Sequence, residues 1–415
     1  MRGDLTMSFE EAERIKREVW RLTCDPFPDV PPVDPEKVAS FFVGRRSEIN
    51  MTLSTLYRGD NVLVRGTWGI GKTAFILTTL HRLQQKTVSN YRKVLPIYIM
   101  DFRGGSVDEF YQTILYSLTR VVKKSVWDRL KFIRPQEVTA IVSIPPASLQ
   151  ARWKTEGRSS VLEQIEGFMR RVEKKHYRLV IALDDLDKTA MQQGVINAMF
   201  HDSLHLLRDR RCAFILTSRA IARLDDLEIS HLGIADSILP LMPMKGERLR
   251  EMTISQLNYV RREFRDDAFP FTEDAVDEIV EKSMGIPRVL NSLCRKTLDI
   301  AAQQGYTKIN STCFENCFHK LQDNLSIRIP PEIKCILFYA LERDGFLVSS
   351  KEETLEEVLA LTGASTVHEL LPYFDRLVQA NYLVRAERAD GISYKVAPGR
   401  EKAAMEGRKL VQSPD

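Results

Sequence analysis

A glycine-rich stretch near residue 70 constrains the fold of this chain more than any other feature. Residues 65–75 read RGTWGIGKTAF and carry the spacing G-x-x-x-x-G-K-T. An apolar run of strand type, Val62 to Val64, precedes the stretch, and a segment with helical spacing follows it. Strand, glycine loop and helix in this order are the setting in which backbone N–H groups curl inward around phosphate oxygens. We therefore predict a phosphate-binding loop between a buried strand and a helix.

The side chains of this loop have separate expected tasks. Lys72 is placed to reach the β- and γ-phosphates of a nucleotide, and the hydroxyl of Thr73 is placed to hold Mg²⁺. The helix that starts near Lys72 adds the positive end of its dipole. The sequence thus predicts a site for ATP and Mg²⁺, with nucleotide contacts from Gly66, Thr67, Trp68, Gly69, Ile70, Gly71, Lys72 and Thr73.

An ATPase also needs an acidic site, and residues 178–188, RLVIALDDLDK, supply one. The residues immediately before Asp184 are continuously apolar, which is typical of a strand buried on both faces. Asp184 then falls at the carboxyl end of that strand, where open α/β sheets bind ligands, and it is the predicted Mg²⁺ partner. Asp185 is the predicted catalytic residue that orients or deprotonates the attacking water, and Asp187 is a weaker alternative.

Composition sets the outer limits. The 415 residues suffice for about two to three domains, and a hydrophobic fraction of 44% can build ordinary cores. A net charge of +4 neither demands nor excludes nucleic acid. The start of the chain lacks the apolar core of a signal peptide and the apolar runs are of strand length, so we expect no membrane span. Six scattered cysteines fit a reducing compartment, and we expect a cytoplasmic protein.

Two clusters contain residue types that bind metals, but neither has the spacing of a strong metal motif. Cys313, Cys317 and His319 lie close together, and His201 and His205 stand four residues apart on an expected helix. Both sets are more simply explained as residues on helix faces. We therefore expect no metal site at either cluster.

The pattern along the chain predicts four parts. Residues 1–36 are expected to form a helix, over 8–22, and then a proline-rich arm. Residues 37–243 alternate strands with helices, which favours a parallel sheet covered on both faces. Strands are expected at 62–65, 94–102, 178–183, 212–217 and 237–241, and helices at about 72–85, 107–124, 159–175 and 191–208. Residues 132–157 follow neither pattern, and we expect an insertion or a mobile loop there.

The other two parts differ from the sheet domain. Residues 244–325 show helical spacing without strands, which predicts a small helical lid with Pro287 at a first helical position. Residues 326–415 read as three helices and a β-hairpin with Asp390 and Gly391 at its turn, which predicts a winged helix with a tail. The predicted fold class is therefore α/β, with a P-loop parallel-sheet ATPase domain followed by a helical lid and a winged-helix domain.

Five short motifs in this order make the chain resemble a known family, the AAA+-related STAND ATPases, which include NB-ARC switch proteins. Origin-recognition initiator ATPases and transposition-associated ATPases are near relatives. The resemblance covers about residues 25–400. It rests on the motifs FVGRRSEI, GTWGIGKT, LVIALDD, ILTSR and GIPR.

The resemblance assigns roles to residues outside the phosphate loop. It implies that Arg219 senses the γ-phosphate and that Arg288 is a second sensor arginine, so both join Lys72 and Asp185 as predicted catalytic residues. It also implies contacts near the base from Pro287 and from the hhGRxxE box, with Val43, Gly44 and Arg45. Arg223, one turn beyond Arg219, is a candidate finger into a neighbouring subunit. Many relatives carry Glu where this chain has Asp185, which implies slow hydrolysis.

The chain also departs from the NB-ARC pattern. We find no Met-His-Asp box at the end of the winged helix, no effector domain before residue 25 and no repeat array after residue 400. A signalling switch of this kind would need a partner protein to carry the sensor or effector. We expect a homo-oligomer, as the family resemblance implies.

Two functions stay open at this point, and both use ATP. The first is a nucleotide-controlled switch that oligomerises or gates a partner protein. The second is an ATP-dependent DNA-binding factor of initiator or transposition-regulator type. The expected recognition helix, residues 365–381, carries one Arg, one His, one Glu and one Asp, whereas a DNA reader favours outward amides and several cations. This near-neutral helix favours the switch, with DNA contact through Arg385, Arg388 or the basic tail as the alternative.

Overall fold

The computed structural model places most of the chain in helices and strands. It describes residues 7–28, 32–85, 93–100, 106–121, 140–142, 157–184, 186, 201–218, 235–323, 331–342, 346–348, 356–362, 367–379, 382–388, 391–397 and 400–412. Within these ranges, no helix is long and apolar enough to cross a membrane.

A parallel sheet forms the centre of the first domain. Its described strands are β1 (Val62–Arg65), β2 (Lys93–Ile99), β3 (Ala140–Val142), β4 (Tyr177–Leu183), β5 (Cys212–Ser218) and β6 (Ser237–Pro240). They lie in the order β3-β2-β4-β5-β1-β6, and every pair is parallel. Strand β5 therefore separates the strand before the phosphate loop from the strand that ends beside Asp184.

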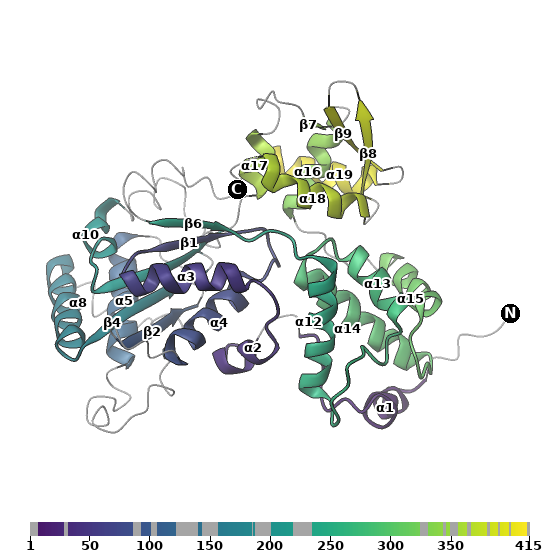
Figure 1. Ribbon diagram of the computed structural model, residues 1–415, viewed down its shortest axis with the longest axis horizontal. Helices are drawn as coiled ribbons and strands as arrows, with labels where there is room; N and C mark the ends of the chain where they lie inside the picture. The colour runs from purple at the N-terminus through teal and green to yellow at the C-terminus, as the bar shows by residue number, and fades with distance from the viewer. Residues whose placement is uncertain are drawn as a thin grey trace.

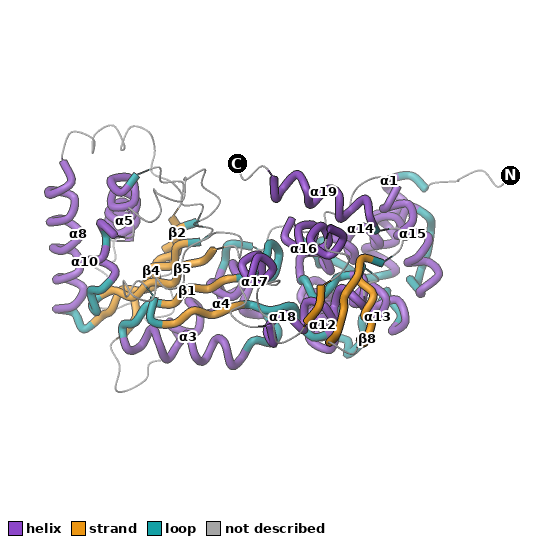
Figure 2. Tube along the Cα trace, turned by 90° about the horizontal axis from the view of Figure 1, so that it is seen from above, coloured by secondary structure: helices purple, strands orange, loops and turns teal. Residues whose placement is uncertain are grey.

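Helices cover both faces of this sheet, as Figure 2 shows. Val62 and Val64 of β1 pack with α3 (Arg46–Arg58) and α4 (Lys72–Gln85), whereas Leu63 faces the opposite cluster. On that opposite face, residues of α5 (Val107–Val121), α8 (Gly157–Lys174) and α10 (Leu204–Leu207) pack against the strands. The parallel sheet is therefore covered by helices on both faces, which explains the continuous apolar runs of its strands and confirms the predicted α/β class.

Strand β3 is a difference from the sequence prediction. It lies within residues 132–157, where we expected an insertion or a mobile loop, and it pairs in parallel with Ile97–Ile99. Three residues are too short for a recognisable alternation, so the pattern could not reveal this edge strand. Of the helix expected at 191–208, the described residues include α10.

The N-terminal segment packs against the lid. Helix α1 (Phe9–Arg14) starts with a capping box at Ser8 and continues into the π-helical turn η1 (Ile15–Val19). Lys16 Nζ lies 2.7 Å from Asp299 of the lid, and Trp20 Nε1 donates to the Thr307 carbonyl at 3.0 Å. Helix α2 (Pro35–Phe41) follows, capped by Asp34. These contacts fix the arm across the lid before the chain enters the sheet domain.

The lid is helical in its described residues and the last domain is a winged helix. The lid contains α12 (Gly246–Val260), α13 (Glu273–Lys282), α14 (Pro287–Gln303) and α15 (Ser311–Asp323). The winged helix contains α16 (Pro331–Glu342), β7 (Phe346–Val348), α17 (Glu356–Thr362), α18 (Val367–Gln379), β8 (Leu383–Arg388) and β9 (Gly391–Val396), followed by α19 (Glu401–Gln412). Strand β7 and helix α19 are additions to the predicted elements.

The winged helix lies over the junction between the sheet domain and the lid (Figure 1). Its helix α18 turns an apolar face inward, with Leu370, Tyr373, Phe374 and Leu377 all buried. Helix α19 packs against α16, and a Cβ at Gly407 would overlap the Lys334 carbonyl, so the close approach requires a glycine. This arrangement brings α16 and α18 next to the phosphate loop.

Candidate functional site

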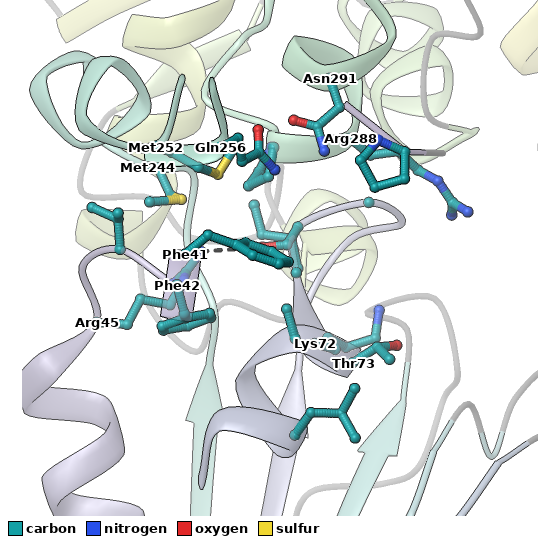
Figure 3. A pocket seen from close by; sticks show the side chains of 18 of the residues that line it. Phe41, Phe42, Arg45, Lys72, Thr73, Met244, Met252, Gln256, Arg288 and Asn291 are labelled. Carbon is teal, nitrogen blue, oxygen red and sulfur yellow. Dashed lines mark hydrogen bonds between the residues drawn. The ribbon is translucent and has the colours of Figure 1, made fainter. Parts of the chain in front are cut away.

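A cavity of about 400 Å³ lies where the arm, the sheet domain and the lid meet. At one end, the apolar side chains of Met244 and Met252 lie near Phe41 and Phe42, together with the polar side chain of Gln256. The other end holds Lys72 and Thr73 (Figure 3). The volume is in the range typical of small-molecule sites. The remaining lining residues are Pro28, Val33, Val43, Arg45, Trp68, Gly69, Ile70, Gly71, Ala74, Leu77, Tyr98, Met100, Asp184, Pro287, Arg288 and Asn291.

The loop between β1 and α4 takes a backbone path that depends on glycine. Gly69 and Gly71 have φ values of +81° and +99°, in the left-handed region that other residues rarely adopt. A Cβ at Gly69 would also lie 2.8 Å from Cβ of Arg288, which is too close. The loop therefore curls tightly beneath the lid, and its N–H groups and the first turn of α4 can face an anion.

Lys72 is held at this loop by backbone carbonyls. Its Nζ donates to the Gly66 carbonyl at 2.7 Å and to the Thr67 carbonyl at 3.3 Å, and the side chain is buried. The lysine is the first residue of α4, where the positive end of the helix dipole adds to its charge. This end of the cavity is therefore strongly cationic.

Asp184 is the centre of a hydroxyl network at the carboxyl edge of the sheet. Its Oδ2 accepts from Thr73 Oγ1 and from the Tyr98 hydroxyl, each at 2.7 Å, and its Oδ1 accepts from Thr217 Oγ1 at 2.6 Å. The carboxylate is 2% exposed, and a buried charge requires such partners. The structure thus brings together Thr73 and Asp184, the two residues that the sequence predicts as Mg²⁺ ligands.

Tyr98 and Thr217 were not identified from the sequence. Both lie near the carboxyl ends of their strands, on β2 and β5. Thr217 is a polar residue near the end of the apolar run CAFILTS, and this pattern is a sequence signal that could have identified it as a residue at the ligand-binding edge of the sheet.

Arg45 links the start of α3 to the loop. It is in the left-handed region with φ of +52°, and its side chain is 7% exposed. Its Nη2 donates to the Met242 carbonyl at 2.8 Å and to the Ile70 carbonyl at 3.4 Å. Burial lowers the pKa of the guanidinium, and Glu48, 3.9 Å away, opposes that shift. Val43 lines the same part of the cavity.

The lid contacts the loop through the first turn of α14. The Arg288 backbone N–H donates to the Gly69 carbonyl at 3.2 Å. The Arg288 guanidinium lies over the Trp68 ring, 4.2 Å from its centroid, in a cation–π contact. Pro287, at the first helical position, lines the cavity. The GIPR motif is therefore adjacent to the phosphate loop.

The winged helix contacts the same loop from another direction. The Trp68 backbone N–H donates to Glu332 Oε1 at 3.0 Å, and the Tyr373 hydroxyl donates to Thr67 Oγ1 at 3.3 Å. Glu332 is fully buried and Tyr373 is 1% exposed. Burial raises the pKa of Tyr373, so its hydroxyl keeps its proton. This contact could not be predicted from the sequence, because an acidic residue in a first helical turn is normally explained by its interaction with the helix dipole.

Some predicted residues lie outside the described part of the chain. These are Asp185, Asp187, Arg219 and Arg223, and the side chain of His319. Cys313 and Cys317 are buried in the lid, and His201 and His205 are exposed. Among the described residues, no group of three or more His, Cys, Asp or Glu side chains could hold a metal ion.

Comparison with known proteins agrees with this site. A protein-family model described as AAA ATPase domain matches residues 42–209. The chain is 21% identical over 401 residues to an uncharacterized HTH-type transcriptional regulator of Methanocaldococcus jannaschii, with 91% of each chain covered.

Two solved structures are among those to which this chain is similar. The Cdc6p protein of Pyrobaculum aerophilum is 15% identical, with a TM-score of 0.45 over 91% of this chain and 98% of that chain. The ORC2 protein of Aeropyrum pernix is 13% identical, with a TM-score of 0.48 over 89% of this chain and 94% of that chain. The assignment to the STAND type stays a prediction. The match of the AAA ATPase domain model to residues 42–209 confirms the expected resemblance to AAA+ ATPases.

Proposed function

We propose that this protein binds ATP, hydrolyses it slowly, and acts as a nucleotide-controlled switch that changes its assembly or gates a partner protein. One observation carries the proposal: the sheet domain, the lid and the winged helix meet at Trp68 of the phosphate loop. Arg288 of the lid lies over the Trp68 ring, and Glu332 of the winged helix accepts its backbone N–H. A ligand bound at this loop would therefore act on two neighbouring domains.

We expect the protein to work in the cytoplasm.

The residues present fit a nucleotide with Mg²⁺. Gly69 and Gly71 have positive φ values, the backbone geometry with which a loop turns successive N–H groups toward an anion. Lys72 and the start of α4 supply positive charge. Thr73 and Asp184 lie in direct contact and would hold Mg²⁺, which when bound neutralises phosphate charge. Asp185 is the proposed residue that positions the attacking water, and its short side chain supports slow turnover.

The switch follows from competition for the loop. A carboxylate and a phosphate oxygen are both anionic acceptors, and both favour the same kind of backbone N–H donor. Glu332 holds the Trp68 N–H while the winged helix is docked. Negative phosphates near this buried carboxylate would repel it, because unit charges interact strongly at low effective dielectric. Nucleotide therefore has different contacts in the docked and released states, which is the condition for a population shift.

Energy transfer between two dyes tests this proposal. Met51 on α3 and Val384 on β8 are 44% and 45% exposed, so both accept cysteine in a Cys24→Ser background. We expect Mg·ATP to change the transfer efficiency relative to ADP and to nucleotide-free protein, and Lys72→Ala to abolish the response. Sizing by light scattering under the same conditions reports assembly. Tight ATP binding with unchanged transfer efficiency and unchanged size would refute the switch.

A second candidate is ATP-dependent DNA binding. It is favoured by the M. jannaschii relative, which is named an HTH-type transcriptional regulator and matches over 91% of its length. Against it, α18 is packed inward, whereas the wing is accessible at Arg385. A DNA clamp that contacts six or more phosphates should show a slope of log affinity against log salt of about −5 or steeper. A salt titration of labelled duplex with non-hydrolysable ATP, repeated with Arg385→Ala, distinguishes the two candidates.

A further inference from the structure

Gln256 occupies a position in α12 where the helix pattern calls for an apolar residue. The buried face of α12 contains Leu249, Met252, Leu257 and Val260, and Gln256 lies on the same face. Gln256 is 5% exposed. Its Oε1 atom is fully buried and accepts no hydrogen bond from the described residues. Such an acceptor destabilises the protein unless a donor reaches it, so a donor from the adjoining cavity would explain its presence.

The surroundings of Gln256 suit a flat aromatic ring. Met252 lies one turn earlier on the same helix, and Met244 and Phe41 lie close by at the apolar end of the cavity (Figure 3). Thioether and aromatic groups pack well against ring faces. The other polar side chain near this end, Arg45, already donates to the Met242 and Ile70 carbonyls. Gln256 is thus a carboxamide placed beside these groups to recognise the edge of a ring.

A second buried acceptor lines the same cavity. Oδ1 of Asn291, on α14, also accepts no hydrogen bond from the described residues. Two lid helices therefore each contribute a carboxamide with an unpartnered acceptor to the lining of this cavity, whose other polar side chains include Arg45, Tyr98, Asp184 and Arg288 (Figure 3). This pattern indicates a ligand that brings hydrogen-bond donors into the lid side of the cavity.

We propose that Gln256 is the residue that selects adenine, an inference that rests on the nucleotide function proposed above. Its Oε1 accepts from the exocyclic amine of adenine, and its Nε2 donates to the neighbouring ring nitrogen, a bidentate pairing that a carboxamide makes readily. Guanine places a carbonyl oxygen where adenine has the amine, so in the present orientation of the Gln256 carboxamide two acceptors would oppose each other, and guanine would bind only if the carboxamide turned over. Gln256 belongs to helix α12 of the lid, so the lid would recognise the base, whereas the loop of the sheet domain would bind the phosphates.

Equilibrium binding of three triphosphates tests this assignment. ATP, GTP and purine riboside triphosphate, which lacks the amine, are titrated into the full chain, with melting temperature as the check of folding. We expect wild type to bind ATP about tenfold more tightly than purine riboside triphosphate. Gln256→Met should bind both with equal, weakened affinity. Gln256→Glu should keep the preference for the amine, because it retains the acceptor. The control Gln303→Met, an exposed carboxamide of the lid, should match wild type.

Different results separate this inference from the proposed function. If wild type binds GTP or purine riboside triphosphate as tightly as ATP, the carboxamide does not select adenine, while triphosphate binding itself stands. Discrimination that survives in Gln256→Met also overturns the assignment. If no triphosphate binds to wild type, both the nucleotide function and this inference are wrong.

Discussion

The contact between Glu332 and the phosphate loop makes a quantitative prediction. Glu332→Gln keeps a carbonyl oxygen in place of Oε1 and nearly the same shape, but it removes the negative charge. Hydrogen bonds to charged groups stabilise by about 1.5–3 kcal/mol and those between neutral groups by about 0.5–1.5 kcal/mol. The exchange should therefore weaken docking of the winged helix on the Trp68 N–H by about 1 kcal/mol, while the Tyr373 contact with Thr67 is retained.

Weaker docking should favour nucleotide. If phosphate and the docked carboxylate compete for the loop, the apparent affinity for Mg·ATP rises by the factor by which docking is weakened. About 1 kcal/mol corresponds to about a fivefold change in the dissociation constant. The assay is a titration with fluorescent ATP, combined with energy transfer between dyes at positions 51 and 384. Transfer in nucleotide-free Glu332→Gln should already move toward the ATP-bound value.

The control is Glu342→Gln, which makes the same change of charge at an exposed position of the same helix. It should leave affinity and transfer unchanged, because no contact with the loop is altered. If Glu332→Gln binds ATP as wild type does, or more weakly, the carboxylate does not compete with nucleotide and the reasoning fails. A fivefold gain in both Gln variants would show a general charge effect and would also refute it.

Two further predictions concern the nucleotide itself. Lys72→Ala should abolish tight ATP binding, measured by calorimetry, because the ammonium at the loop is lost; unchanged affinity would refute the assignment of the site. Asp185→Asn should bind Mg·ATP but release phosphate far more slowly, whereas Asp184→Ala should weaken Mg²⁺-dependent binding itself. If Asp185→Asn turns over at the wild-type rate, another group, with Asp187 first, positions the water.

Local patterns were enough to predict the phosphate loop and every described strand of the parallel sheet except β3. The apolar run before Asp184 and the glycines of residues 66–71 are properties of adjacent residues, and each dictates backbone geometry or burial without help from distant parts of the chain. The strand β4 and the loop before α4 therefore lie where they were expected. The side-chain contact between Thr73 and Asp184 follows in turn, because the carboxyl ends of parallel strands share one edge of the sheet.

Contacts that depend on packing between domains could not be predicted in this way. Glu332 looks like an ordinary first-turn acidic residue, and Tyr373 looks like part of an apolar stripe; their meeting with the loop arises from the docking of the winged helix. Helix α19 contains Gly407, which lowers helix propensity, and its packing against α16 overrides that preference. Gln256 is unusual because it is polar and buried, and its burial results from the packing of the folded chain and could not be seen in the local sequence.

The position of α18 connects the two candidate functions. Tyr373 of α18 contacts Thr67, so this face of the recognition helix cannot lie in a DNA groove while the winged helix is docked. If α18 reads DNA, release of the winged helix must come first, and nucleotide that favours release must raise DNA affinity. Coupling is reciprocal, so duplex DNA must then raise ATP affinity by the same factor. Measuring ATP affinity with and without duplex therefore tests DNA binding through this helix: an equal gain in both directions supports it. DNA binding without any effect on ATP affinity assigns the contact to the exposed wing at Arg385.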